Sequence, residues 1–169
     1  MGAQILVMVL LPLLLAVAAG WDLASFTIPN FLPACLLAGF VFFVPAAHLT
    51  FHAVILHALA GLLGLALGFT LFALGYIGGG DAKLFAAIAL WLGFADLAEF
   101  AIAASLFGGL LTLTLLTMRQ WTLPAIMARQ GWIGRLHARD SGIPYGVALA
   151  AGAFAVLPYT EIFRLAAGV

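Results

Sequence analysis

The sequence predicts an all-α integral membrane protein, a six-transmembrane-helix bundle with short loops. Hydrophobic residues make up 66% of the 169-residue chain and charged residues only 7%, whereas an average soluble domain is about 25% charged. The mean hydropathy is +1.26. Between Asp22 and Asp81 lie 58 residues without an acidic, lysine or arginine side chain. The apolar stretches of the chain do not alternate between apolar and polar residues, as the strands of a membrane β-barrel do.

Composition also excludes several protein classes. The chain lacks the polar surface of a soluble enzyme and the basic surface of a nucleic-acid-binding protein. Net charge is zero, and Cys35 is the only cysteine, so no intrachain disulfide and no cysteine-based zinc site can form. Six spans of roughly 20 residues would use about 120 residues. We therefore expect one membrane-embedded domain over residues 1–169.

Three helices are expected in the first half of the chain. The first runs from Ala3 to about Gly20; it follows no basic residue, so we expect a retained span rather than a cleaved signal peptide. The second runs from about Asn30 to Val44, with Pro29 near its first turn, where a missing N–H costs little. After a bend near residues 45–52, the third runs from about Val54 to Gly75.

Three further helices are expected in the second half. The fourth, about Asp81 to Phe94, is short for a full span, and the fifth runs from about Leu97 to Met118. The sixth runs from about Pro144 to Pro158. The long segment 119–142 contains two tryptophans and several arginines, which suggests that it lies on the inner headgroup surface.

Basic residues predict the orientation of the bundle. With six spans, the loops after the first, third and fifth helices share one side of the membrane. That side holds five of the six basic residues, and only Arg164 lies on the other. By the positive-inside rule, the five-residue side is cytoplasmic and both termini face out. The five residues are Lys83, Arg119, Arg129, Arg135 and Arg139.

Two aspartates fall on this cytoplasmic side, each at the end of an expected helix. Asp22 ends the first span, and Asp81 follows Gly78-Gly79-Gly80. Acids at a membrane boundary are costly unless paired, hydrated or functional. As a pair, one ionised carboxylate can act as general base on a water while the other, protonated, polarises a carbonyl oxygen. A plain glycine-rich turn with Asp81 as a helix cap remains the alternative.

The wider pattern resembles the type IV prepilin peptidases. Residues 78–83, Gly-Gly-Gly-Asp-Ala-Lys, resemble the G-x-G-D-x-K motif of that family. Asp22 shortly before Ile28-Pro29-Asn30 resembles its other catalytic stretch. Ile143-Pro144-Tyr145-Gly146 resembles the start of its last helix. The resemblance covers nearly the whole chain, although the family often has Arg or Lys between the first aspartate and I-P-N, and this chain has none there.

The resemblance implies an aspartic endopeptidase with Asp22 and Asp81 as its catalytic pair and no cofactor. Its substrate would be a prepilin or pseudopilin, from which it removes a positively charged leader at the cytoplasmic face of the bacterial inner membrane. The small size resembles the short branch that serves Tad-type (Flp) pili, without a methyltransferase domain. Membrane lipid and pilus-assembly proteins are further expected partners, and nucleic acid is not. Expected to bind substrate or shape the site are Gly78, Gly79, Gly80, Lys83, Pro29, Asn30, Pro144, Tyr145 and Gly146.

Alternatives remain open at this point. A small proton- or cation-coupled transporter also carries intramembrane acids, and an inactive relative could serve as a pilus-assembly scaffold. His48 and His52 have a workable metal-ligand spacing but lie opposite the aspartates in the expected topology, so we predict no metal site. Gly64 and Gly68 form a G-x-x-x-G pair, for which we expect a packing role within the bundle.

Overall fold

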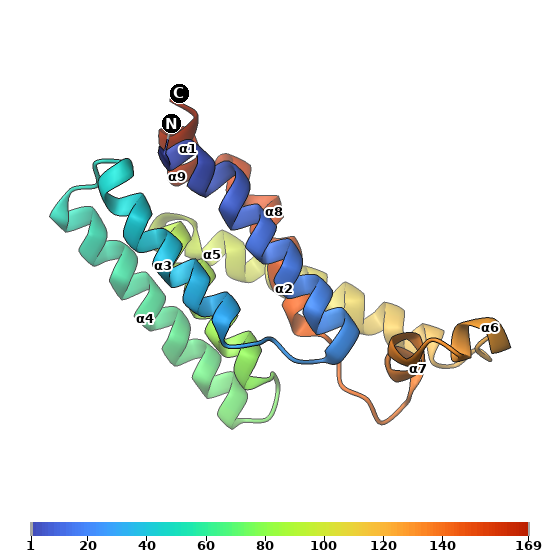
Figure 1. Ribbon diagram of the computed structural model, residues 1–169. Coiled ribbons are helices and arrows are strands. Elements are labelled where there is room, and N and C mark those ends of the chain that lie inside the picture. Colours follow the sequence, from blue (N-terminus) through green and yellow to red (C-terminus); the bar gives the residue numbers. More distant parts are fainter. Residues whose placement is uncertain (1, 169) are drawn as a thin grey trace.

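The computed structural model describes residues 2–168, and these form helices joined by turns. Both ends of the described chain lie together at one end of the molecule, where α1 meets α9 (Figure 1). The longest helix, α5, packs against α3, α4 and α8, and α8 also packs against α2. The elements are α1 Gly2–Ile5, the π-helical η1 Leu6–Leu10, α2 Leu11–Ser25, α3 Phe31–Ala46, α4 Phe51–Ala73, α5 Gly79–Met118, α6 Ala125–Ala128, α7 Gly131–His137, α8 Tyr145–Val156, the 3-10 helix η2 Leu157–Tyr159 and α9 Glu161–Ala167.

The number of membrane spans differs from the six expected. Among the described residues, three helices are long and apolar enough to cross a membrane: Gly2–Ser25, α4 and α5. A fourth span results if α8–η2 and α9, bent by 57°, are counted together. The 16 residues of α3 reach about 24 Å, short of a hydrocarbon core of roughly 30 Å. The predicted second and third helices match α3 and α4 within a few residues, but six spans are not confirmed.

The predicted fourth and fifth helices are two arms of α5. Gly93 breaks the helix with φ 70° and ψ −175°, a conformation that costs glycine little. Phe85 and Phe100 stack at 5.1 Å between ring centroids. In a straight helix these residues would be about 22 Å apart, so α5 folds back at Gly93 into a first arm (residues 79–92) and a second arm (residues 94–118), as Figure 1 shows.

A histidine supports this break. His57 Nδ1 of α4 lies 2.9 Å from the carbonyl oxygen of Leu90, near the turn at Gly93. Because a carbonyl oxygen only accepts, the contact requires a proton on Nδ1. A Cβ at Gly93 would lie 3.1 Å from the His57 ring. His57 therefore satisfies a carbonyl near the break, which matters where water is scarce.

The first helix extends further than the sequence suggested. It was expected to end near Gly20, but α2 continues to Ser25 and ends where Phe26 adopts the left-handed conformation, φ 57°. The Phe26 N–H donates to the carbonyl of Asp22 at 2.7 Å. Asp22 is thus held in the last helical turns rather than in a following loop.

Glycines of α4 allow close packing against the first arm of α5, as expected for Gly64 and Gly68. A Cβ on Gly64 would lie 2.7 Å from the Cβ of Ala89, and one on Gly68 would lie 2.9 Å from the Cα of Ala82. The packing role is confirmed by these distances. Since Ala82 follows Asp81, α4 also fixes where that carboxyl lies.

This close approach predicts the effect of a larger residue at position 68. Gly68→Val is expected to push the first arm away from α4 and to destabilise the protein by about 1–3 kcal/mol, as overpacking usually does. The midpoint of thermal unfolding in detergent measures the change. The matched substitution Gly20→Val is a control, because a Cβ at Gly20 has nothing within 4 Å; equal destabilisation by both would contradict the packing.

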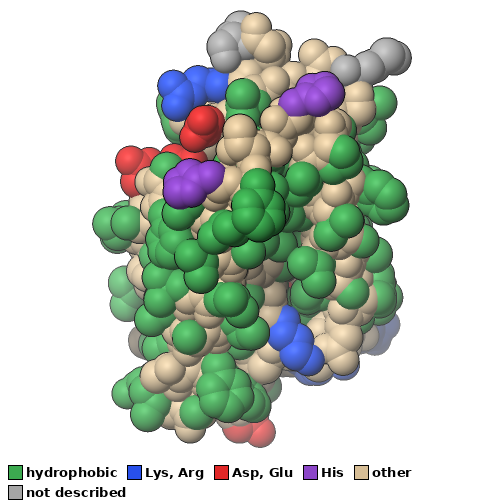
Figure 2. Space-filling model, turned by 90° about the vertical axis from the view of Figure 1, so that its left-hand side faces the viewer, with side chains coloured by type: hydrophobic (Ala, Val, Ile, Leu, Met, Phe, Trp, Pro, Cys, Tyr) green, Lys and Arg blue, Asp and Glu red, His purple; other side chains and the backbone are tan. Residues whose placement is uncertain are grey.

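The surface fits a multi-pass membrane protein. On the face shown in Figure 2, hydrophobic side chains cover the middle of the molecule and charged side chains lie toward its ends. Large apolar side chains are exposed along the helices, among them Phe42 at 69% and Leu106 at 69%. Such exposure is costly in water and natural in a bilayer.

Candidate active site

Asp22, near the end of α2, is buried against the start of α8. Its side chain is 3% exposed, and its Oδ2 accepts a hydrogen bond of 2.7 Å from the backbone N–H of Gly146. A Cβ on Gly146 would lie 2.9 Å from that same oxygen. Only glycine therefore lets the first turn of α8 come this close to the carboxyl group.

Asp81 is buried in the first turn of α5. Its side chain is 7% exposed, and its Oδ2 accepts from the Gly78 N–H at 2.9 Å. Asp81 thus has the capping role that the alternative interpretation gave it. Its other oxygen, Oδ1, is buried without a hydrogen-bond partner among the described residues. A buried polar atom left unsatisfied is costly and calls for an explanation, and capping does not supply one.

The two carboxyl groups share one site although 58 residues separate them in the chain. The Gly146 N–H donates to Asp22, and Asp81 lies close enough to Asp22 for the two carboxyl groups to interact electrostatically. This amide belongs to the N-terminus of α8, an end that favours negative charge. The structure therefore brings together the two aspartates that the sequence singled out, beside the Gly146 that the resemblance added.

The glycines before Asp81 belong to the helix start rather than to a loop. Gly78 is the N-cap residue, and Gly79 and Gly80 form the first helical turn. A Cβ on Gly80 would lie 2.9 Å from the Cβ of Ile28 and 3.2 Å from its backbone nitrogen. At Gly79 a Cβ would make only ordinary contact with Phe72. Gly80 is thus the glycine of this motif whose small size the packing requires.

Ile28 is a site residue that the sequence reasoning did not single out. It is 7% exposed and lies against Gly80 of α5. A Cβ on Gly146 of α8 would also lie 2.7 Å from the Ile28 Cδ1. The side chain therefore sits between the two helix starts that carry the site. Its place directly before Pro29-Asn30 was a signal that could have identified it.

Lys83 and Asn30 pair on the outside of the site. Lys83 Nζ donates to Asn30 Oδ1 at 2.7 Å, in an exposed position. Lys83 is exposed, whereas Asp81 is buried, so in this structure the lysine pairs with Asn30 rather than with a carboxylate of the site. The pair instead ties α5 to the loop that carries Ile28. Pro29 accepts the Leu32 N–H at the start of α3.

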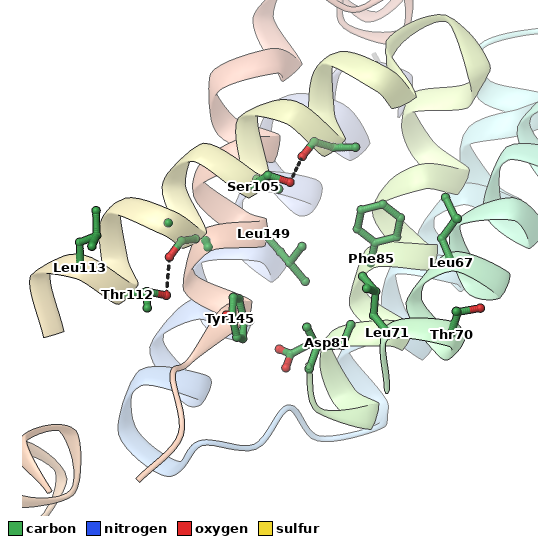
Figure 3. Close-up of a pocket in the computed structure, with 16 residues that line it drawn as sticks. Leu67, Thr70, Leu71, Asp81, Phe85, Ser105, Thr112, Leu113, Tyr145 and Leu149 are labelled. Atoms are coloured by element: carbon green, nitrogen blue, oxygen red, sulfur yellow. Dashed lines mark hydrogen bonds between the residues drawn. The ribbon is translucent and has the colours of Figure 1, made fainter. Parts of the chain in front are cut away.

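A cavity of about 690 Å³ opens beside Asp81. Figure 3 shows Asp81 and Tyr145 at the lower edge of it, between Thr112 of the second arm and Leu71 of α4. Tyr145 is half-buried and lines this cavity, whereas Pro144 is buried next to it. Of the residues expected to shape the site, Tyr145 therefore reaches the cavity itself.

A buried arginine holds the segment before α8. Arg119 is 7% exposed and donates from Nε to the Leu136 carbonyl at 2.9 Å. Its two other nitrogens donate to the carbonyl and hydroxyl of Ser141 and to the carbonyl of Gly142. Sequence reasoning treated Arg119 only as an orientation signal. In the structure it anchors the chain that leads into Pro144 and α8.

The arginine's role predicts a local loosening when it is removed. Arg119→Gln cannot supply the same fork of donors, so amides of residues 131–142 are expected to exchange with deuterium at least about tenfold faster, which corresponds to about 1.4 kcal/mol of lost local stability. Hydrogen-exchange mass spectrometry measures this. Arg129→Gln, at an exposed position of the same segment, is the control. Equal exchange in both variants would rule out the anchor.

Chemically, the site offers two adjacent carboxyl groups, backbone N–H donors at two helix starts and an apolar cavity. Two carboxyl groups in one low-dielectric site share a proton readily, because both cannot easily carry charge. This arrangement suits general acid–base chemistry on a water. Among residues 2–168, the structure forms no cluster of three or more metal-ligating His, Cys, Asp or Glu side chains.

Comparison with known proteins identifies a family whose model covers more than half of the chain. A family model described as the type IV leader peptidase family matches residues 9–113, which include Asp22 and Asp81. Neither a curated protein nor a solved structure matches the chain significantly. The matched region ends before α8, so the Gly146 contact lies outside it.

Proposed function

Since this chain belongs to the type IV leader peptidase family, we propose that it removes the positively charged leader of Flp-type prepilins or pseudopilins, with Asp22 and Asp81 as its catalytic pair. The observation that carries this proposal is that both carboxyl groups are buried in one site, where Asp22 accepts from the Gly146 amide and Asp81 Oδ1 has no partner among the described residues. The free oxygen is where a water or the scissile carbonyl would bind.

In the proposed mechanism, one aspartate is ionised and the other carries a proton. The ionised carboxylate removes a proton from a water as the water oxygen attacks the scissile carbonyl carbon. The protonated carboxyl gives its proton to the carbonyl oxygen, which forms a tetrahedral diol. The C–N bond then breaks, and a proton passes to the departing amine. The leader leaves with a new carboxyl terminus and the pilin with a new amino terminus.

The other motif residues have positioning roles in this proposal. Gly80 and Gly146 let the starts of α5 and α8 approach Ile28, which sets the distance between the two acids. Gly78 holds one oxygen of Asp81 and thereby leaves the other free. Lys83, Asn30 and Pro29 fix the connecting loop, and Pro144 fixes the start of α8.

We place the protein in the bacterial inner membrane with the aspartates at the cytoplasmic face and both termini outside. Supporting this, five of the six basic residues lie near the start of α5, as Asp81 does, or between the end of α5 and the start of α8, which contacts Asp22. The leader's positive charges would then stay in the cytoplasm while the pilin's apolar helix stays in the bilayer. Lipid and the pilus-assembly proteins are the remaining expected partners.

Co-expression with a tagged Flp-type prepilin tests the proposal. The wild-type chain is expected to shorten the pilin by its leader, and N-terminal sequencing identifies the cut. An uncut panel of prepilins in the presence of well-inserted protein would contradict it. Asp22→Glu separates this proposal from a transporter: a proton relay often tolerates the longer acid, whereas a dyad held to about 0.5 Å does not.

A further inference from the structure

The cavity beside Asp81 continues as a groove along the second arm of α5. On one side it is lined by Leu67 and Leu71 of α4 and Phe85 of the first arm. On the other side lie Ser105, Gly109 and Thr112 of the second arm. Leu67 and Leu71 are 48% and 43% exposed. The groove is therefore open sideways, toward the region that lipid would occupy in a membrane.

The second arm presents a smooth face to this groove. Ser105, Gly109 and Thr112 follow one another at spacings of four and three residues, which places them on one side of the helix. The two hydroxyls donate to carbonyls of their own helix, at 2.7 Å each, and so leave no unsatisfied polar group. Small residues at this spacing let another helix approach closely in a membrane. At Gly109 a Cβ would meet nothing within 4 Å, so this part of the face is unoccupied.

The candidate catalytic acid lines this groove. Asp81 lines the same cavity and is only 7% exposed. Its Oδ1 has no hydrogen-bond partner among the described residues. A small-residue face alone would indicate only packing. Its continuity with an unsatisfied carboxyl group indicates a ligand that has an apolar helical part and, at one end, a group that this oxygen can bind.

Resting on the function proposed above, we propose that the apolar helix of the prepilin enters this groove from the membrane and packs against Ser105, Gly109 and Thr112, with its cleavage site at Asp81. The peptide at the end of that helix supplies the polar partner for Oδ1. A second cavity of about 450 Å³, lined by Ala34, Leu37 and Lys83 among others, contains neither aspartate. It is the competing docking surface.

A steric block tests the proposal without disturbing the fold. Gly109→Leu fills the groove, and since its Cβ has free space, the protein is expected to insert and unfold like wild type. Prepilin cleavage is expected to fall at least tenfold. The matched control is Gly20→Leu, which changes an equally open helical glycine on α2, outside the groove, and is expected to stay within about twofold of wild type. Unchanged cleavage by Gly109→Leu would overturn the proposal.

Cross-linking gives a readout that does not depend on cleavage. In a Cys35→Ala background with Asp22→Asn to prevent turnover, Ser105→Cys is expected to form a disulfide with a cysteine placed in the first turns of the prepilin's apolar helix. Ala34→Cys, in the second cavity, is expected not to. A disulfide at position 34 but not at position 105 would overturn the proposed docking site. A disulfide at neither position would also overturn it and would leave lipid as the occupant of the groove.

These outcomes separate the two proposals. If wild type cleaves the prepilin while Gly109→Leu is unaffected and residue 105 stays unlinked, only the docking site is wrong. If wild type leaves every prepilin uncut, the proposed function fails, and the docking site fails with it.

Discussion

Asp22→Asn and Asp81→Asn are each expected to stop prepilin cleavage, with losses of at least about 10³-fold. Asparagine has nearly the same shape, and its amide oxygen can still accept from the Gly146 or Gly78 N–H, so the local fold is kept. What it lacks is a group that takes up and releases a proton. Cleavage of the tagged prepilin in cells, normalised to the amount of inserted enzyme, measures the loss.

The control for this prediction is Asp96→Asn. Asp96 lies just after the turn of α5, near Glu161 and Arg164, at the other end of the molecule from the dyad. The same chemical change there is expected to leave cleavage within about twofold. Normal cleavage by Asp22→Asn or by Asp81→Asn would show that the substituted aspartate is not part of the mechanism.

Gly146→Ala is expected to lower cleavage by about 10²-fold, because a displacement of about 1 Å in a catalytic constellation has effects of that size. The added methyl group would lie 2.7 Å from the Ile28 Cδ1 and 2.9 Å from the Asp22 Oδ2. Both are ends of side chains, so the damage falls on the position of the carboxyl rather than on the helices. Steady-state cleavage and the thermal midpoint together measure this.

Gly20→Ala provides the matched comparison. It makes the same substitution two residues before Asp22, where a Cβ meets nothing within 4 Å. Alanine is favoured over glycine in a helix by about 1 kcal/mol, so stability is expected to rise slightly while cleavage is unchanged. If Gly146→Ala cleaves as well as Gly20→Ala, the close approach of α8 to Asp22 is not needed for activity.

The aspartates could be found from sequence because their chemistry is visible there. Acids are rare in so apolar a chain, and Asp22 and Asp81 also stood within recognisable motifs. Gly146 could be named only through its motif, since it lies 124 positions after Asp22 and no local pattern links the two. The packing of Gly64 and Gly68 followed from spacing along one helix face.

Other features depend on tertiary contacts that a local pattern does not encode. The break between the predicted fourth and fifth helices lies within a few residues of its expected place, but its cause was not visible from sequence: Gly93 was not singled out, and His57 contacts Leu90, 33 positions further along the chain. The end of α2 rests on a left-handed Phe26, a conformation that non-glycine residues rarely adopt. Six spans stay a prediction: among the described residues three helices, or four with the bent pair, are long and apolar enough to cross a membrane, and hydropathy does not show where a long apolar stretch turns.

The most direct test of the catalytic pair compares four proteins in liposomes with purified prepilin: wild type, Asp22→Asn, Asp81→Asn and the double variant. Rates of leader release under single-turnover conditions are the measurement. If the two acids act as one unit, each single substitution removes about as much activity as both together. Losses that multiply in the double variant would mean that the two aspartates act independently, which would contradict a shared catalytic site.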